Sequence, residues 1–245
     1  MSTRPAEVAR AVRLLSLGEH FLAERTANIG LRLNPDDGVL RQIRGIARHH
    51  LDQFEQAIED LEVAMSIIPL SALAMWCLAD SYRRMSKRKR AFDAYLWLIS
   101  RKDCPPGLLA RTAVGLGRMG EDELALTSCE AIVERYPESP IGHGGMAYYM
   151  SRLGYSTRAI LPRALKACEL APANKDFKAQ LGILLSVSGQ HDKAKSVLTE
   201  LSTETIGCPH LSTRIARAFE TSGDPLKAGA WWSHAVNLTG GKASG

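Results

Sequence analysis

Few residues in this sequence have the types and spacing that catalysis or cofactor binding requires. The stretch GLGRMG, from Gly115 to Gly120, matches the GxGxxG pattern of dinucleotide sites, but that pattern must follow a strand and open a helix. Here the flanking apolar spacing is helical, and Gly120 closes a helix. His49 and His50 are adjacent, so on a helix they point to different faces and do not chelate a metal as residues four apart would. We therefore predict no nucleotide, metal or other cofactor.

The cysteines also argue against a chemical role. No CxxC pair occurs among the five, which are Cys77, Cys104, Cys129, Cys168 and Cys208. An odd number of cysteines without such a pair argues against both a zinc finger and a disulfide framework. Two of them precede proline, as haem-ligating cysteines can, but a proline turn explains both dipeptides more simply. No Ser-His-Asp, Cys-His or paired-carboxylate constellation is present. We predict that the protein is not an enzyme.

The strongest charge feature is a basic cluster of six Arg or Lys between Arg83 and Arg90. The chain has 31 basic and 26 acidic residues, a net charge of +5, so this cluster alone exceeds the net charge. A solvated turn, an acidic protein partner, a nucleic acid and a targeting signal would each explain it. Nucleic-acid binding would favour several aromatic residues beside the charges. Only Tyr82 and Phe92 are near, and we expect both to be buried.

The elements that carry these residues follow an internal period of 34 residues. The clearest marker is an alanine that recurs every 34 residues, with one spacing of 35: Ala23, Ala57, Ala91, Ala125, Ala159, Ala194 and Ala228. Pro35, Pro69 and Pro137 share the period, and Pro172 is one residue late. Seven repeats are indicated. The extra residue is expected within AILPRALKACELAP, residues 159–172.

The pattern predicts that each repeat is a pair of helices joined by a turn. Twelve residues before each marker alanine is a small residue: Ala11, Gly45, Ala79, Ala113, Ala147, Gly182 or Ala216. Small residues at facing positions let two helices approach closely. Five residues before each alanine is a turn or cap residue: Gly18, Asp52, Ser86, Gly120, Gly154, Gly189 or Gly223. The apolar spacing between these marks is helical.

This pattern resembles the tetratricopeptide-repeat family over residues 4–238. The second repeat supplies Gly45, Phe54, Ala57, Leu61, Ala64 and Pro69, and the last supplies Ala216, Phe219, Gly223, Ala228, Trp232 and Ala235. The resemblance implies an all-α, right-handed superhelical solenoid of about seven hairpins. The expected repeats are 4–37, 38–71, 72–105, 106–139, 140–174, 175–208 and 209–238, in one domain that is followed by a flexible tail at 239–245.

In this family the first helices line a concave face that takes an extended peptide or a partner's helix. In that alignment, Trp76 and Tyr148 are the large groove residues that could be exposed binding anchors; the alternative is that they pack between neighbouring repeats. One row carries a cation in four consecutive repeats: His50, Arg84, Arg118 and Arg152. With Arg83, Lys87 and Arg88 beside it, this row would face acidic groups on a partner, since guanidinium forks suit carboxylates. A merely solvated row is the competing interpretation.

The C-terminal end suggests a second contact site. Trp231 and Trp232 are adjacent in the last expected helix, and the repeat alignment gives Trp232 the core position. We expect Trp231 to lie in an exposed apolar patch that supports weak self-association, with a monomer or a weak homodimer as the two possible states.

The sequence therefore predicts a non-catalytic scaffold, adaptor or chaperone-like protein that binds a protein or peptide of acidic and apolar character. The alternatives are a nucleic-acid-binding repeat protein that uses residues 83–90, and a regulatory subunit of an enzyme. The N-terminal residues have charges within every apolar run, so neither a signal peptide nor a spanning helix is expected. We expect a cytoplasmic protein with no membrane insertion.

Overall fold

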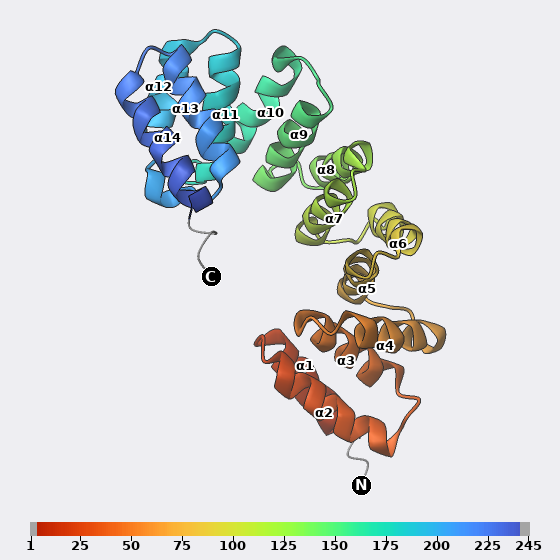
Figure 1. Ribbon diagram of the computed structural model, residues 1–245. Helices are drawn as coiled ribbons and strands as arrows, with labels where there is room; N and C mark the ends of the chain where they lie inside the picture. The colour runs from red at the N-terminus through yellow and green to blue at the C-terminus, as the bar shows by residue number, and fades with distance from the viewer. Residues whose placement is uncertain (1–3, 241–245) are drawn as a thin grey trace. The chain divides into compact units, whose positions relative to one another are not determined.

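The computed structural model describes residues 4–240, and within this range it contains fourteen α-helices, one short 3-10 helix and no strand (Figure 1). The helices are α1 (Arg4–Ser16), α2 (His20–Leu33), α3 (Gly38–His50), α4 (Phe54–Ile67), α5 (Ala72–Arg84), α6 (Arg88–Ser100), α7 (Pro106–Arg118), α8 (Asp122–Arg135), α9 (Pro140–Arg152), α10 (Thr157–Leu170), α11 (Lys175–Val187), α12 (His191–Thr199), η1 (Thr203–Thr205), α13 (Pro209–Thr221) and α14 (Pro225–Gly240). The predicted all-α fold class is thereby confirmed. None of these helices is long and apolar enough to cross a membrane.

The helices form consecutive hairpins because a residue with positive φ ends the first helix of each pair. Five of these residues are glycines, with φ from 72° to 80°, and the other two are Asp52 (φ 59°) and Ser86 (φ 57°). The next N–H then donates back into the helix, as from Glu121 N to Leu116 O at 3.0 Å. This is the bonding that satisfies helix-end carbonyls at a left-handed residue.

Polar caps fix the start of several first helices. The Asp37 carboxylate accepts from Val39 N at 3.0 Å and from Leu40 N at 3.2 Å, and the Asn174 side chain accepts from Phe177 N at 3.1 Å. Such caps satisfy N–H groups that have no partner inside the helix.

Small residues occur where the two helices of a hairpin cross. A Cβ added at Gly45 would lie 2.6 Å from Leu61 Cγ, and one at Gly182 would lie 2.4 Å from Leu198 Cγ. The marker alanine Ala125 is also buried. At these crossings a larger side chain would have to push the second helix away.

The position predicted for the extra residue is wrong. Ala159, the expected marker of the fifth repeat, is exposed, and the next residue, Ile160, is buried with only 2% exposed. Gly154 ends α9 at φ 76°, but α10 begins only at Thr157, so the extra residue lies in the turn, at Tyr155 or Ser156. The turn absorbs the residue, and the helix keeps its buried face.

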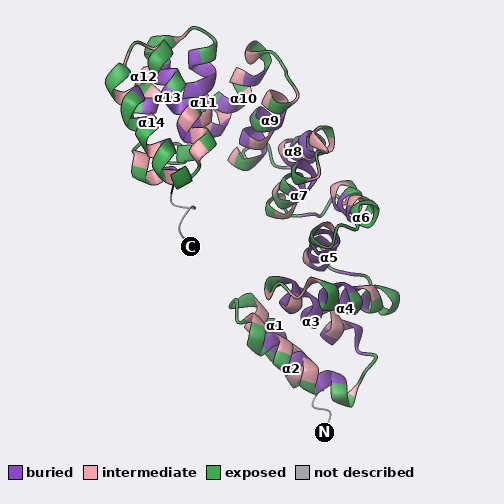
Figure 2. Cartoon of the chain, viewed as in Figure 1, coloured by how far each residue is buried: buried purple, intermediate pink, exposed green. Residues whose placement is uncertain are grey.

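The chain divides into two compact units, residues 1–128 and 129–245, with the division inside α8. In the N-terminal unit, first helices pack on the next first helix, as α3 does on α5 and α5 on α7. In the C-terminal unit, α11 packs on α13 in the same way. Figure 2 shows buried residues along the facing sides of the paired helices in both units.

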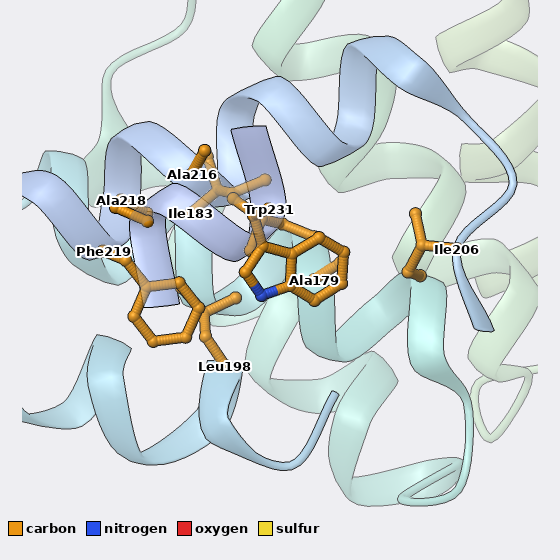
Figure 3. Close-up of a cluster of buried hydrophobic side chains, with 10 residues drawn as sticks. Ala179, Ile183, Leu198, Ile206, Ala216, Ala218, Phe219 and Trp231 are labelled. Carbon is orange, nitrogen blue, oxygen red and sulfur yellow. The ribbon is translucent and has the colours of Figure 1, made fainter. Parts of the chain in front are cut away.

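The expectation for Trp231 is also wrong, because this side chain is 3% exposed, whereas Trp232 is partly buried. Helix α12 ends early, at Thr199, and the following segment places Ile206 in the core beside Trp231 (Figure 3). Trp231 thus fills space left by the short helix, and it presents no exposed patch. Helix α14 also continues through residues 239 and 240, which were expected in the tail; residues 241–245 lie outside the described range.

Candidate functional site

A pocket of about 450 Å³ lies on the first helices of three consecutive hairpins in the N-terminal unit. Its lining comes from α3, the turn after it and the first residue of α4, and from α5 and α7: His49, His50, Asp52, Phe54, Trp76, Asp80, Arg84, Ala110, Arg111, Val114, Gly115 and Arg118. Four of the predicted binding residues, His50, Trp76, Arg84 and Arg118, therefore meet in one place. We call it the N-terminal pocket.

Trp76 forms a wall of this pocket and packs between neighbouring repeats, which is the stated alternative to an exposed anchor. Its side chain is 7% exposed, and the Arg111 guanidinium lies over the ring, 3.6 Å from the ring centroid. His49 meets the same indole edge to face, with ring centroids 5.3 Å apart. Stacking on an indole holds a guanidinium by its face and leaves N–H groups at its edge available. Trp76 thus positions Arg111.

Asp80 is the anionic centre of the wall formed by α5. Its carboxylate accepts from Arg83 Nε at 2.8 Å and from the Tyr95 hydroxyl at 3.2 Å, and Arg84 Nε lies 3.6 Å away. Burial, followed by the neighbouring Asp80 charge, raises the pKa of Tyr95 well above its ordinary value. Asp80 is thus compensated by its own neighbours.

The two histidines at the end of α3 favour their neutral forms. Burial lowers the pKa of His49 to about 4, with Asp80 opposing this shift and His50, Arg111 and Arg84 adding to it. His49 Nδ1 is 2.9 Å from the Ser81 hydroxyl. Burial also lowers the pKa of His50, whose ring stacks on that of His20 with centroids 4.3 Å apart. The positive charge of the pocket therefore comes from its arginines.

Three guanidiniums border the pocket, and they differ in their partners. Arg84 Nε lies 3.6 Å from the Asp80 carboxylate, and the Arg84 guanidinium lies 5.3 Å from the centroid of the Phe54 ring. Arg111 and Arg118 are both exposed, and neither has a carboxylate within ion-pair distance among residues 4–240. Such cations can still pair with an anion from outside. The pocket therefore offers two guanidiniums beside aromatic and aliphatic walls.

The rest of the basic cluster lies outside this pocket and is partly neutralised. Arg83 binds Asp80, Arg88 Nη2 lies 2.5 Å from Glu121, and Arg90 Nη1 lies 2.8 Å from Glu62. Lys87 is exposed just before α6. Asp80 lies on the same helix as Arg83, whereas Glu62 of α4 and Glu121 in the turn before α8 come from other parts of the fold. The linear sequence did not reveal these last two pairings.

The last two predicted residues belong to the C-terminal unit. Tyr148 is 46% exposed on α9, and the Arg152 guanidinium lies 5.9 Å from its ring centroid. They form a local pair of the same kind as Arg111 and Trp76, with a larger separation.

Sequence reasoning missed Arg111, His49 and Phe54 as pocket residues. Arg111 was not among the predicted binding residues, and its long side chain reaches back to Trp76 from the next hairpin. One signal was available, since Arg111 precedes the predicted Arg118 by seven residues and two residues at that spacing share a face of a helix.

Within the described residues, no group of three or more His, Cys, Asp or Glu could hold a metal ion. Burial raises the pKa of the Cys77 and Cys129 thiols to about 12, which keeps them protonated and unreactive.

No family model and no curated protein matches this sequence. Solved structures match it at low identity. A tetratricopeptide repeat protein from Parabacteroides merdae is 14% identical with a TM-score of 0.67, covering 96% of this chain and 93% of its own. The APC/C hetero-tetramer of Cut9 and Hcn1 is 14% identical with a TM-score of 0.66, and the match covers 95% of this chain and 46% of that one. A mutant of IFIT1 with m7Gppp-AAAA is 14% identical with a TM-score of 0.60, and the match covers 97% of this chain and 59% of that one.

The chain thus spans less than two thirds of the Cut9–Hcn1 and IFIT1 chains that it matches, and nearly all of the Parabacteroides merdae chain. At these identities the likeness concerns the backbone. Together with the paired helices and their spacing, it shows that the fold of this chain is that of the tetratricopeptide-repeat proteins.

Proposed function

We propose that this protein is a non-catalytic scaffold that binds an acidic, partly apolar segment of a partner protein in the N-terminal pocket. Asp or Glu side chains of the segment pair with Arg111 and Arg118, and a neighbouring apolar side chain lies against Phe54 and Val114. The observation that carries this proposal is the guanidinium of Arg111, stacked on Trp76 without an acidic partner in the described part of the chain.

The size and polarity of the pocket support a peptide segment as the ligand. A volume of about 450 Å³ accommodates a few side chains. Phe54 and Val114 offer apolar surface, while Arg111 and Arg118 offer paired N–H donors for carboxylates. A segment that has an apolar side chain beside an acidic one would contact both the apolar surface and the arginines.

The state of the titratable groups supports binding over catalysis. Asp80 is tied to arginines, and burial with a lowered pKa keeps His49 neutral. General acid–base chemistry needs a group that reaches the substrate and titrates near the working pH. Neither residue meets that requirement in this arrangement.

A second candidate, RNA binding, is favoured by one comparison, since the IFIT1 structure holds m7Gppp-AAAA. In this chain Arg88 and Arg90 of the basic cluster pair with Glu121 and Glu62. RNA bound at the basic cluster would have to displace those acids. An acidic peptide bound at Arg111 and Arg118 has no acid to displace within the described range. We therefore favour the peptide and keep RNA as an outcome of the test.

The experiment uses an array of C-terminally amidated nonapeptides, each with acidic residues around one apolar residue. The tightest binder is measured by fluorescence anisotropy against the parent, the Arg111→Glu/Arg118→Glu variant and the charge-matched control Arg25→Glu/Arg32→Glu. Arg25 and Arg32 are exposed on α2 and lie outside the pocket. Charge reversal in the pocket is expected to weaken binding by about tenfold or more, and the control by less than about twofold.

Equal binding by the parent and the pocket variant would contradict the proposal, as would an array without any binder. A single-stranded RNA is titrated in parallel at several salt concentrations. If it binds more tightly than every peptide, with a steep salt dependence, the RNA candidate replaces the peptide.

A further inference from the structure

A second pocket of about 430 Å³ lies in the C-terminal unit, on the first helices α11 and α13 and at the start of α12. Its lining residues are Ile183, Ser186, Val187, His191, Arg214, Arg217, Ala218 and Thr221. None of them lines the N-terminal pocket, and none was predicted as a binding residue. We call it the C-terminal pocket.

Aliphatic side chains give this pocket an apolar surface. Ile183 and Ala218 are buried beneath it, and Val187, at the end of α11, is 71% exposed. The two hydroxyls in the lining are used internally, since Ser186 and Thr221 share a hydrogen bond of 2.6 Å and Thr221 donates to Ala218 O at 3.1 Å. Neither hydroxyl is therefore left over for a ligand, and an apolar group placed on this surface meets no unsatisfied hydroxyl.

Two guanidiniums border this apolar surface. Arg214 and Arg217 are three residues apart on α13, so they share a face of the helix, and both are exposed. Neither has an acidic partner within ion-pair distance among the described residues. The nearby acid Glu220 accepts a hydrogen bond from Trp232 Nε1 at 2.8 Å. The two cations thus remain available to an external anion.

We propose that the C-terminal pocket binds a short acidic and aliphatic segment of a partner protein. An aliphatic side chain of the segment covers Val187 and packs over Ile183 and Ala218, and an Asp or Glu side chain next to it pairs with Arg214 and Arg217. Complementarity with both features identifies this occupant. A free inorganic anion would use the arginines but leave Val187 exposed, whereas a neutral apolar segment would leave both guanidiniums without a partner.

This site differs from the N-terminal pocket in its walls. There, Trp76 and Phe54 present aromatic surface; here the surface is aliphatic. The proposal rests on the C-terminal unit alone, so it stands or fails independently of the function proposed above.

The test uses three fluorescein-labelled, C-terminally amidated peptides and the full chain. The probe is Gly-Glu-Leu-Glu-Leu-Gly, a second peptide has Ser at both Leu positions, and a third has phosphoserine at both Glu positions. Anisotropy is measured for the parent, Arg214→Glu/Arg217→Glu, Val187→Ser, and the control Arg158→Glu/Lys175→Glu, whose two residues are exposed outside the pocket.

Reversal of Arg214 and Arg217 is expected to weaken binding of the Leu peptide by about tenfold or more, and the control variant should change it by less than about twofold. Val187→Ser should weaken the Leu peptide by several-fold and leave the Ser peptide unchanged, because only the Leu peptide uses the apolar surface. This second variant keeps every charge, so it separates apolar recognition from general attraction to a basic surface.

Three outcomes would overturn the proposal. One is unchanged binding of the Leu peptide to the Arg214→Glu/Arg217→Glu variant, and another is equal affinity of the Leu and Ser peptides. The third is tighter binding of the phosphoserine peptide, which would indicate a phosphate site. Arg111→Glu/Arg118→Glu is measured with the same probe. If only that variant loses binding, the probe occupies the N-terminal pocket, and the second site is refuted while the first stands.

Discussion

The two units stabilise the same kind of helical hairpin with different interactions. In the N-terminal unit, buried carboxylates join neighbouring helices: Asp60 of α4 accepts from Arg44 Nε and Arg48 Nη1 of α3, both at 2.8 Å, and Asp80 of α5 accepts from the Tyr95 hydroxyl of α6 at 3.2 Å. In the C-terminal unit, the described residues include no buried carboxylate, and its helices meet through apolar clusters such as the one around Trp231 (Figure 3).

The residues at the hairpin turns also differ between the two units. Both non-glycine residues with positive φ, Asp52 and Ser86, lie in the N-terminal unit, while the hairpin turns of the C-terminal unit have Gly154, Gly189 and Gly223. The repeat pattern thus specifies where helices start, stop and cross, but it leaves open whether charge or apolar contact joins them. The stability of the two units should therefore respond differently to substitution and to pH.

The largest expected effect is the loss of the Asp60 carboxylate. Its side chain is 3% exposed and lies between Arg44 and Arg48, so among the described residues Asp60→Ala would leave the partly buried Arg44 without a carboxylate and Arg48 with Glu24 alone. We expect a loss of about 3–5 kcal/mol in the free energy of unfolding. Urea denaturation followed by circular dichroism measures it.

The control for Asp60 is Glu200→Ala in the C-terminal unit, which removes an exposed partner of Lys178. Exposed pairs contribute about 0–1 kcal/mol. If both substitutions have the same cost, the proposed difference between the units is wrong.

A smaller effect concerns pH and the buried His49. Its pKa in the folded protein, about 4, is below the ordinary value of 6.5, chiefly because burial disfavours the imidazolium. The unfolded chain therefore takes up a proton first, so this stabilisation is complete above pH 6.5 and is lost as the pH falls toward 4. Between pH 7 and pH 5 the loss from this residue is about 2 kcal/mol.

His49→Gln removes this titration. Urea denaturation at both pH values should show that the variant loses less stability on acidification than the parent does. Equal losses in the two proteins would mean that His49 contributes nothing to the acid sensitivity of the N-terminal unit.

The smallest effect comes from the turns. Ser86 has φ 57°, a left-handed conformation that costs a residue with a Cβ atom more than it costs glycine. Ser86→Gly should stabilise the protein by about 0.5–1 kcal/mol, after the entropy cost of glycine in the unfolded chain. The reverse change at Gly154, Gly154→Ser, should destabilise it by a similar amount. Thermal unfolding measures both, and a shift of the same sign in the two variants would contradict this account.

Much of the fold was predictable because every repeat must meet the same steric requirements at its turn and at its helix crossing. The turn residues and most marker alanines recur at sites where only a small side chain or a left-handed residue fits, as Ala125 illustrates. Ala159 misled the prediction because it lies 34 residues after Ala125 while the structure uses Ile160 at that position. Residue type alone cannot separate an alanine that is buried from one that is exposed.

The candidate site was predictable only in part. His50, Arg84 and Arg118 occupy the same place in consecutive first helices, so their shared pocket follows from the period. The role of Arg111 does not, because spacing along the sequence gives the position of a Cα atom and not the direction of a long side chain. Trp231 was missed for a different reason: its burial depends on Ile206, which comes from the irregular segment after a shortened α12.

The turn between α9 and α10 has a practical consequence for handling this protein. It already holds one residue more than the hairpin turns before it, and Tyr155 there is 50% exposed, while Ile160 keeps its buried position in α10. A residue added inside a helix would instead rotate every following side chain by about 100° around the axis. Residues 154–156 are thus a suitable place to insert an epitope tag or a protease cleavage site, since the added sequence would extend from the surface and both helices would keep their faces.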